Sequence, residues 1–349
     1  MLLALLLAAP LGCEAELTRP DAGPGADAAA LDAGVPDAGP SDAGRPDGPP
    51  SIDAGPPDAG PPPVTRIAVL SDLNGSYGST TYASTVHAAV ERVVAWAPDL
   101  VLTTGDMVAG QRAGLDYRAM WDGFHAAVSE PLAAASIPLA VTPGNHDASG
   151  YASYAEERAI FVDEWTARRP AVDFVDDADY PLRYAFRLGP ALFVSLDDTT
   201  VGALSDAQMG WLDAVLEAHE AAVTVVYGHL PLYPFAEGRE TEVIGDPALE
   251  DLLVHHGVDL FVSGHHHAYY PGRRGPLRLV SMACQGASPR PLIGGDGARS
   301  RSIVRLELDA EGIRVLDAFG GPAYDERVER ATLPPHVGSG ETRVDRDDR

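Results

Sequence analysis

The chain has 349 residues, a length that suits one large domain or two small ones. Its 51 acidic side chains outnumber its 25 basic ones, and the net charge of −26 repels phosphate backbones, so a nucleic-acid-binding role is disfavoured. The two cysteines, Cys13 and Cys284, are too few for a disulfide framework.

The amino end has the pattern of an export signal, because residues 2–11 form an apolar run that is too short to span a bilayer. Pro10-Leu11-Gly12-Cys13 ends this run and resembles the lipobox of bacterial lipoproteins. The resemblance implies that residues 1–13 are a lipoprotein-type signal peptide and that Cys13 is acylated. We therefore expect an exported, membrane-anchored protein of a bacterial cell envelope. Pro10 stands where leucine is usual, and no basic residue precedes the run; a plain cleaved signal, giving a periplasmic or extracellular protein, is the alternative.

Residues 14–63 are of low complexity, with six copies of Asp-Ala-Gly and proline between them. Large apolar side chains are almost absent, so no core can offset the entropy of ordering this segment. A coil of this length has a mean span of roughly 40 Å, and proline stiffens it further. We predict a disordered tether.

From residue 64 the pattern is that of a globular domain, which we expect to end at residue 330. Short apolar runs predict strands at residues 66–70, 100–102, 137–141, 182–188, 191–196, 223–227, 260–262, 277–281, 303–308 and 313–318. Apolar residues at helical spacing predict helices at residues 86–96, 117–128, 151–166, 206–219 and 249–255. Ser205 is placed to cap the helix that begins at residue 206. This order predicts a layered α/β sandwich with a mixed central pair of sheets, and the polar residues 331–349 predict a disordered tail.

Five of the predicted strands end in side chains that can bind metal ions. They are Asp72 with Asn74, Asp106, Asn145 with His146, His229, and His265 with His267. Open α/β sheets place their ligands at the carboxyl ends of strands, so these side chains can converge on one edge. Each of these residues has a structural interpretation when it is taken singly. A strand-end aspartate is then a turn former, a lone histidine is a buried core residue, and the triple histidine is a solvated loop with His266 pointing outward. Their joint occurrence favours a metal site.

This ordered set resembles the calcineurin-like metallophosphoesterase family between Ile67 and His267. The resemblance implies a metallophosphoesterase-like fold and two divalent metal ions, for which manganese, magnesium, zinc and iron are all candidates. It implies a ligand set for each ion: Asp72, Asp106 and His267 for the first, and Asn145, His229 and His265 for the second, with Asp106 bridging the two. In this family a hydroxide between the ions attacks phosphorus in line, and His146 matches the histidine that protonates the leaving oxygen.

Two positions depart from the family's patterns. Asn74 stands where a histidine is usual, and a carboxamide is a weaker and harder ligand than imidazole, so the first ion is expected to be held more loosely or to be Mn²⁺ or Mg²⁺. Ala109 stands three residues after Asp106, where the purple acid phosphatase variant has a tyrosine, which argues against that variant.

Residues 272–305 contain seven arginines and one acid, whereas the chain as a whole is acidic. Arg273, Arg274 and Arg290 are therefore candidates for a rim that binds phosphate, with a solvated face as the alternative of equal weight. Together these observations favour a metal-dependent hydrolase of phosphate esters. Two alternatives stay open: a phosphodiesterase rather than a monoesterase, and a non-catalytic binding module whose metal site has decayed at Asn74. The substrate and the oligomeric state also stay open. Cys284 is expected to be a small buried residue rather than a nucleophile.

Overall fold

The computed structural model describes residues 63–349. The predicted signal peptide with Cys13, and the predicted tether except for its last residue, lie outside the described residues. Within the described part of the chain, no helix is both long and apolar enough to cross a membrane.

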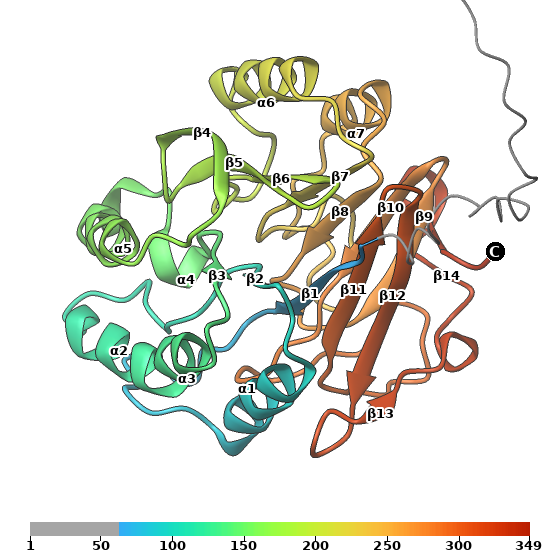
Figure 1. The fold of residues 1–349 in the computed structure, drawn as a ribbon. Helices are drawn as coiled ribbons and strands as arrows, with labels where there is room; N and C mark the ends of the chain where they lie inside the picture. Colours follow the sequence, from blue (N-terminus) through green and yellow to red (C-terminus); the bar gives the residue numbers. More distant parts are fainter. Residues whose placement is uncertain (1–62) are drawn as a thin grey trace, which may run out of the picture. The chain divides into compact units, whose positions relative to one another are not determined.

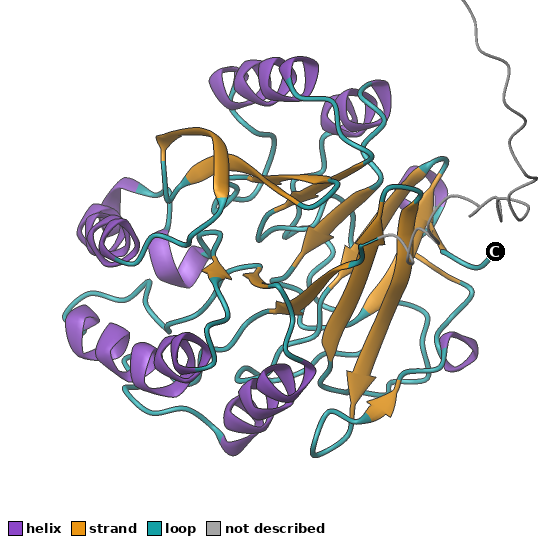
Figure 2. Cartoon of the chain, viewed as in Figure 1, coloured by secondary structure: helices purple, strands orange, loops and turns teal. Residues whose placement is uncertain are grey.

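The strands form two sheets, shown in Figure 1 and Figure 2. The first sheet has six strands in the order β13-β12-β11-β1-β2-β3. Its members are β1 (Thr65–Leu70), β2 (Leu100–Thr103), β3 (Leu139–Ala140), β11 (Ile303–Asp309), β12 (Gly312–Gly320) and β13 (Glu326–Arg327). β1, β2 and β3 are parallel, whereas β11 pairs with β1 in antiparallel register.

The second sheet has nine strands in the order β14-β15-β9-β10-β8-β7-β6-β5-β4. Its members are β4 (Asp173–Asp179), β5 (Arg183–Leu188), β6 (Ala191–Ser195), β7 (Val223–Tyr227), β8 (Leu260–Ser263), β9 (Tyr270–Arg274), β10 (Leu277–Ser281), β14 (His336–Val337) and β15 (Val344–Arg346). β6, β7, β8 and β10 are parallel, so both sheets are mixed and each has a parallel centre.

Helices cover the outer face of each sheet (Figure 1). They are α1 (Ser84–Trp96), α2 (Tyr117–Phe124), α3 (Glu130–Ala134), α4 (Asn145–Ala148), α5 (Ala155–Ala167), α6 (Asp206–Ala218) and α7 (Pro247–His255), with the short turns η1 (His125–Ser129), η2 (Ala152–Tyr154), η3 (Arg330–Thr332) and η4 (Gly340–Thr342). Ser205 caps α6 as predicted, because its side chain accepts a hydrogen bond from the Gln208 N–H.

The alternation of side chains along the strands explains the layers. In β1, Ala68 and Leu70 pack with the helices α1, α2 and α5, whereas Ile67 and Val69 point into the core between the sheets. In β6, Leu192 and Val194 face α6 and α7, and Phe193 faces the first sheet. Because both faces of the central strands are buried, the predicted layered α/β sandwich with a mixed pair of sheets is confirmed.

The prediction of a disordered tail at residues 331–349 is wrong. β15 pairs with β9, Val337 and Val344 are buried in the core of the second sheet, and Arg346 is only 4% exposed. The segment is polar because it forms the edge of a sheet, where charged side chains discourage pairing with another chain. The folded part therefore continues to the last residue of the sequence.

Candidate metal centre

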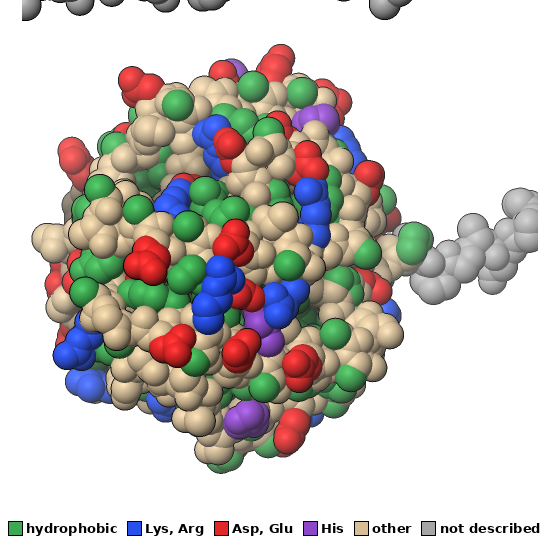
Figure 3. Space-filling view, turned by 90° about the vertical axis from the view of Figure 1, so that its left-hand side faces the viewer, with side chains coloured by type: hydrophobic (Ala, Val, Ile, Leu, Met, Phe, Trp, Pro, Cys, Tyr) green, Lys and Arg blue, Asp and Glu red, His purple; other side chains and the backbone are tan. Residues whose placement is uncertain are grey.

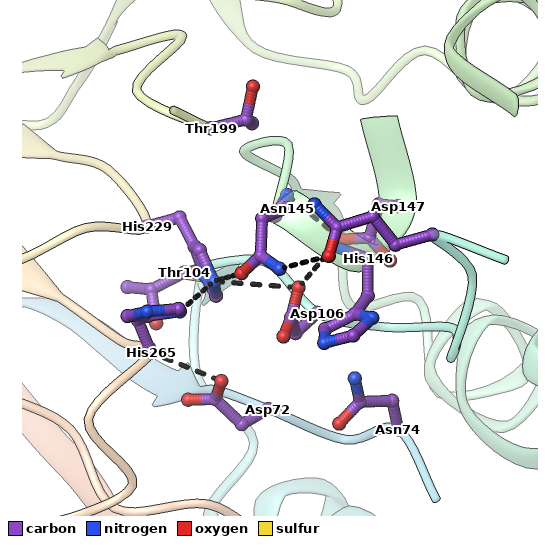
Figure 4. A network of polar contacts seen from close by, with 12 residues as sticks. Asp72, Asn74, Thr104, Asp106, Asn145, His146, Asp147, Thr199, His229 and His265 are labelled. Atoms are coloured by element: carbon purple, nitrogen blue, oxygen red, sulfur yellow. Dashed lines mark hydrogen bonds and ion pairs between the residues drawn. The ribbon is translucent and has the colours of Figure 1, made fainter. Parts of the chain in front are cut away.

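The metal-capable side chains lie on the loops that follow the parallel strands. Asp72 follows β1, Asp106 follows β2, and Asn145 and His146 open α4 just after β3, all from the first sheet. The second sheet contributes His229 after β7, and His265 and His267 after β8. The structure brings these predicted residues together, and Figure 4 shows Asp72, Asp106, Asn145, His229 and His265 turned toward one another with His146 beside them.

Four of the candidate ligands have a left-handed backbone. The φ angles are 49° at Asp72, 57° at Asp106, 61° at His265 and 54° at His267. A non-glycine residue in this region costs about 1–3 kcal/mol and is kept where the surroundings enforce it. These four are half of the eight non-glycine residues with a positive φ in the described part of the chain.

Glycine allows the loops after β2 and β3 to touch. A Cβ on Gly105 would lie 2.6 Å from the Gly144 Cα, and a Cβ on Gly144 would lie 2.1 Å from the Asp106 backbone nitrogen. Only residues without a side chain fit at these two positions. The contact brings Asp106 and Asn145, the residues that follow the two glycines, to one point.

The second site comprises Asp106, Asn145, His229 and His265. The Nε2 atom of His229 lies 2.8 Å from Asn145 Oδ1, 3.1 Å from His265 Nδ1 and 3.5 Å from Asp106 Oδ1. His229 is fully buried, and His265 is 6% exposed. Burial and the neighbouring His229 lower the pKa of His265 well below its ordinary value, so its ring is neutral.

Hydrogen bonds on the far side of each ligand determine which atom faces the second site. His229 donates its Nδ1–H to the Thr104 carbonyl at 2.8 Å, and His265 donates its Nε2–H to Glu242 Oε2 at 2.9 Å. Asn145 donates its amide to Gln111 Oε1 at 3.1 Å. The atoms left facing one another are therefore one nitrogen of each imidazole and a carboxamide oxygen, beside the Asp106 carboxylate. This set of nitrogen and oxygen atoms fits a divalent cation, which would bind all four residues.

The first site comprises Asp72, Asp106 and His267, with Asn74 next to them. One ligand atom from each of Asp72, Asp106 and His267 lies within 4.8 Å of the other two, and His267 Nε2 is 3.2 Å from Asp72 Oδ1. His267 donates its Nδ1–H to the Ser288 carbonyl at 3.0 Å, so its Nε2 faces the carboxylates. These donors also fit a divalent cation, and they are richer in oxygen than those of the second site.

The Asp72 carboxylate favours a protonated His267 at the first site. Burial alone would lower the pKa of His267, but the Asp72 carboxylate outweighs it, and the pKa is raised. Burial would raise the pKa of Asp72, yet His267 and the Ser71 hydroxyl lower it overall. The two residues form an ion pair that a metal ion must displace.

Asn74 lies at the expected place but is weakly held. It is 6% exposed, its backbone N–H donates to the Asp106 carbonyl at 3.0 Å, and its side-chain amide donates to the Val108 carbonyl at 3.4 Å. That bond leaves the carboxamide oxygen on the side of Asp72 (Figure 4). Asn74 thus offers the first site one neutral oxygen.

His146 stands beside the first site without belonging to it. Its backbone N–H donates to Asp106 Oδ1 at 2.9 Å, and its Nδ1 lies 3.1 Å from the Gly110 carbonyl. The Nδ1–H is the donor to that carbonyl, which leaves Nε2 as the atom that can exchange a proton. The ring also contacts Tyr77 edge to face, with 5.4 Å between the centroids.

Several residues that support the site were not predicted. Glu242 accepts from His265 and also pairs with Arg239. Asp147 accepts backbone N–H groups of Met107 and Val108, both at 2.8 Å, and so joins the loops after β2 and β3. Asp198 accepts the His229 N–H at 2.6 Å. The signal for Asp147 and Asp198 was present, because both are acids that follow apolar strands; Glu242 lies in a loop and has no such signal.

Two other expectations fail in the structure. His266 does not point outward: it is fully buried, and burial with the charge of Arg239 lowers its pKa to about 3. Its Nδ1 accepts the Phe235 N–H and its Nε2–H donates to the Glu242 carbonyl, so it ties the loop that carries Glu242 to β8.

Of the three predicted rim arginines, only one lies near the centre. Arg274 bonds to Glu250 and to the carbonyls of Glu341 and Arg343, and Arg273 bonds to the Gly275 carbonyl at the tip of the hairpin. They hold the C-terminal segment, several strand residues away from His267. Arg290 is different, because its backbone N–H donates to the His267 carbonyl at 3.2 Å. Cys284 is buried and burial raises the pKa of its thiol to about 12, as expected for a structural residue.

Comparison with known proteins identifies the group to which this arrangement belongs. The model of the calcineurin-like phosphoesterase family matches residues 65–269. Purple acid phosphatase 15 of Arabidopsis thaliana is 27% identical over 273 residues, which cover 71% of this chain and 47% of the relative. Purple acid phosphatase 18 of the same plant is 29% identical over 210 residues, covering 58% of this chain and 45% of the relative. The chain spans about half the length of the curated relatives it matches.

Solved structures share the fold. A purple acid phosphatase from yellow lupin (Lupinus luteus) seeds matches with a TM-score of 0.59 and 18% identity, covering 77% of this chain and 53% of that one. A dimetal phosphatase from Danio rerio matches with a TM-score of 0.51 and 18% identity, covering 76% of this chain and 98% of that one. From Ala109 we argued against the purple acid phosphatase variant of the family. The curated relatives are nevertheless purple acid phosphatases, although this chain has no tyrosine at that position. Because the family model covers more than half of the chain and its motifs converge at one centre, the chain belongs to the calcineurin-like phosphoesterase family.

Proposed function

We propose that the protein hydrolyses phosphate monoesters at a centre of two divalent cations, with His146 as the general acid. The observation that carries this proposal is the convergence of ligand atoms at the second site, where Asn145 Oδ1, His265 Nδ1 and Asp106 Oδ1 all lie within 3.5 Å of His229 Nε2. The family and its purple acid phosphatase relatives imply the same dinuclear centre.

Each cation has its own residues in this proposal. Asp72, Asp106 and His267 hold the first with help from Asn74, and Asn145, His229 and His265 hold the second with Asp106 shared. Two bound cations supply Lewis acidity and make water acidic enough to act as a nucleophile near neutral pH. The identity of the metals follows from the donors: the oxygen-rich first site suits Mn²⁺ or Mg²⁺, and the second site, with two imidazoles, suits zinc or iron as well.

His146 supplies the proton that the leaving oxygen needs. Its ring is fixed by the bond between Nδ1–H and the Gly110 carbonyl, so Nε2 delivers the proton. A position next to Asp106 suits a group that acts beside the cations without binding them. This arrangement also favours an enzyme over a binding module, because a site that only holds ions has no use for an oriented histidine outside the ligand set.

The charges around the centre favour monoesters over diesters. Arg239 pairs with Glu242, which accepts a hydrogen bond from His265, and the Arg290 backbone N–H donates to the His267 carbonyl, so both arginines lie beside the centre. Two guanidinium groups suit a dianionic phosphoryl group, whereas a diester carries one charge. The relatives are named phosphatases, which agrees with this choice. Arg273 and Arg274 have no part in the proposal.

A panel of phosphate mono- and diesters tests the function. The protein is dialysed against chelator, reloaded with Mn²⁺, Mg²⁺, Zn²⁺ or iron, and assayed against each ester. We expect monoesters to turn over faster than the matched diesters in at least one metal form. Turnover of diesters alone would replace the monoesterase by a phosphodiesterase. No turnover in any form, with both ions bound, would support the binding module.

We further propose that the protein is exported and anchored by a lipid at Cys13, on the basis of its sequence pattern alone. Cys13→Ala should release the protein from the membrane fraction, because the apolar run is too short to hold it. Fractionation of cells that express either form measures this. Retention of the variant in the membrane after signal removal would rule out the lipid anchor.

A further inference from the structure

The wall next to His146 exposes an aromatic ring. Tyr77 is 55% exposed, more than any other large apolar side chain of the described residues, and its ring lies 5.4 Å from the His146 ring. Single exposed aromatic residues are common on protein surfaces and need no function. Tyr77 differs because of its place: it touches the group that, in the proposed function, faces the leaving oxygen.

The backbone holds this ring in position. Tyr77 lies in a turn closed by the bond from the Ser79 N–H to the Ser76 carbonyl, and the Gly78 N–H donates to the Ala109 carbonyl at 3.1 Å. Gly78 has a φ of 76°, and a Cβ there would lie 2.9 Å from Leu115 Cδ2, so the turn fits closely against its neighbour. The ring is therefore presented by a turn fixed to the loop after β2, which also carries the partner of His146, Gly110.

A positive charge lies over the ring. The guanidinium of Arg112 is 5.8 Å from the centre of the Tyr77 ring, within the range of a cation–π contact. In residues 63–349, Arg112 forms no ion pair with a carboxylate, in contrast to Arg239, which pairs with Glu242. Arginine, carboxylate and histidine side chains lie together near the middle of the face in Figure 3. The wall beside His146 thus combines an exposed aromatic ring with a guanidinium over that ring.

We propose that Tyr77, together with Arg112, forms the leaving-group subsite and makes the protein prefer phosphate esters whose leaving group carries a flat aromatic ring. This inference rests on the proposed function, because His146 defines the leaving-group side. The ring would stack on the exposed part of Tyr77 while its ester oxygen lies at His146 Nε2. The aryl group of an aryl phosphate and the base of a small nucleotide share this chemistry.

Binding of non-hydrolysable analogues separates this subsite from the chemistry. Methylphosphonate and phenylphosphonate present the same anionic group, and only the second carries a ring. Calorimetry with the metal-loaded full chain should show tighter binding of phenylphosphonate. Tyr77→Ala should weaken that binding by roughly three- to tenfold, the range expected for one aromatic pair, and leave the binding of methylphosphonate unchanged. Tyr77→Phe should bind both like the wild type.

Tyr151 provides a matched control, because it is 49% exposed and forms no ring contact with His146 in the described residues. Tyr151→Ala should change neither affinity. Comparison of AMP with ribose 5-phosphate as substrates then identifies the ring: a Tyr77-dependent preference for AMP assigns a nucleotide base, and a preference confined to phenyl assigns aryl esters.

Three results would overturn the inference. Equal affinity of the wild type for both phosphonates, or an equal loss of both in Tyr77→Ala, would remove the subsite while the phosphoesterase activity stands. Binding of neither phosphonate, together with no turnover of any ester, would overturn the proposed function as well.

Discussion

The first and the second site share Asp106, yet the chain supports their other ligands differently. In the second site, His229, His265 and Asn145 each make another bond behind the ligand atom, at 2.8 to 3.1 Å. In the first site, His267 has a similar bond to the Ser288 carbonyl at 3.0 Å but is already paired with Asp72, and Asn74 is held by one side-chain bond of 3.4 Å. The ligands of the second site are preorganised. At the first site, the ion must displace the proton of His267, and one of its ligands is a weak neutral oxygen. The second ion should therefore bind more tightly than the first.

The largest effect is expected from a substitution that removes the proton donor and leaves both metal sites intact. His146→Ala should slow monoester hydrolysis by about 10²- to 10⁴-fold, because the leaving oxygen loses its proton donor. Metal analysis should find both ions still bound. The loss should shrink for esters with acidic leaving groups, which depart without a proton.

His219→Ala, at the end of α6 and outside the centre, is the control and should have no effect. An equal loss for all leaving groups would show that His146 is not the general acid.

A substitution next to His265 should weaken the second site, so that it no longer binds its ion more tightly than the first site does. Glu242→Ala removes the carboxylate that orients His265, and should weaken the second site by about 10- to 100-fold. Competition with a chelator, followed by metal analysis, measures the two affinities separately. Glu242→Gln keeps an oxygen that can accept from His265 and should recover part of the affinity.

Glu240→Ala, in the same loop, is the control. Glu240 accepts a hydrogen bond from the Gly238 N–H and none from a metal ligand, so its loss should leave both sites unchanged. Loss of the first ion rather than the second in Glu242→Ala would contradict the positioning role of Glu242.

Lower pH should empty the first site before the second. The pKa of His267 is raised above its ordinary value of 6.5, so a proton competes with the ion as the pH falls through that raised pKa. The pKa of His265 is lowered well below 6.5, so no proton competes there in the same range. As the pH falls below the raised pKa of His267, the first site should lose up to about tenfold in affinity per pH unit, and the second should change little. Metal content after dialysis at each pH tests this order, and simultaneous loss of both ions would contradict it.

The smallest effect should come from strengthening the first site. Asn74→His replaces a neutral oxygen by imidazole, and should raise affinity by about tenfold or less while shifting the preference of the first site toward zinc. The second site should hold its ion in both proteins. If the wild type keeps two tightly bound ions and the substitution alters nothing, another side chain completes the first site.

The fold was predictable where local patterns decide it. The central strands β1, β2, β7 and β8 are apolar runs, and α6 has its serine cap, so each was found. β9 was missed because Pro271 and Gly272 lie inside it, and this pair of residues is typical of turns rather than strands. β4 was missed because its acids give an exposed edge strand no apolar alternation. β4 pairs with β5 and β9 pairs with β10 through backbone hydrogen bonds, which an apolar pattern does not show.

The same distinction holds for the centre. Its candidate ligands follow apolar strands directly, and the carboxyl ends of parallel strands meet at one edge, so their convergence could be predicted. Glu242 was not found, since its bond to His265 spans 23 positions and arises from the path of a loop. Arg273 and Arg274 were misplaced for the converse reason: a local excess of arginine says nothing of which end of β9 they occupy.

Stepwise reloading of the dialysed wild type with Mn²⁺ tests the central claim, a dinuclear centre with unequal sites, most directly. Metal content and the hydrolysis of phenyl phosphate are measured at each addition. We expect that one ion survives mild chelation with little turnover, and that a second restores the activity. Full activity with one ion, or no activity with two, would contradict this centre.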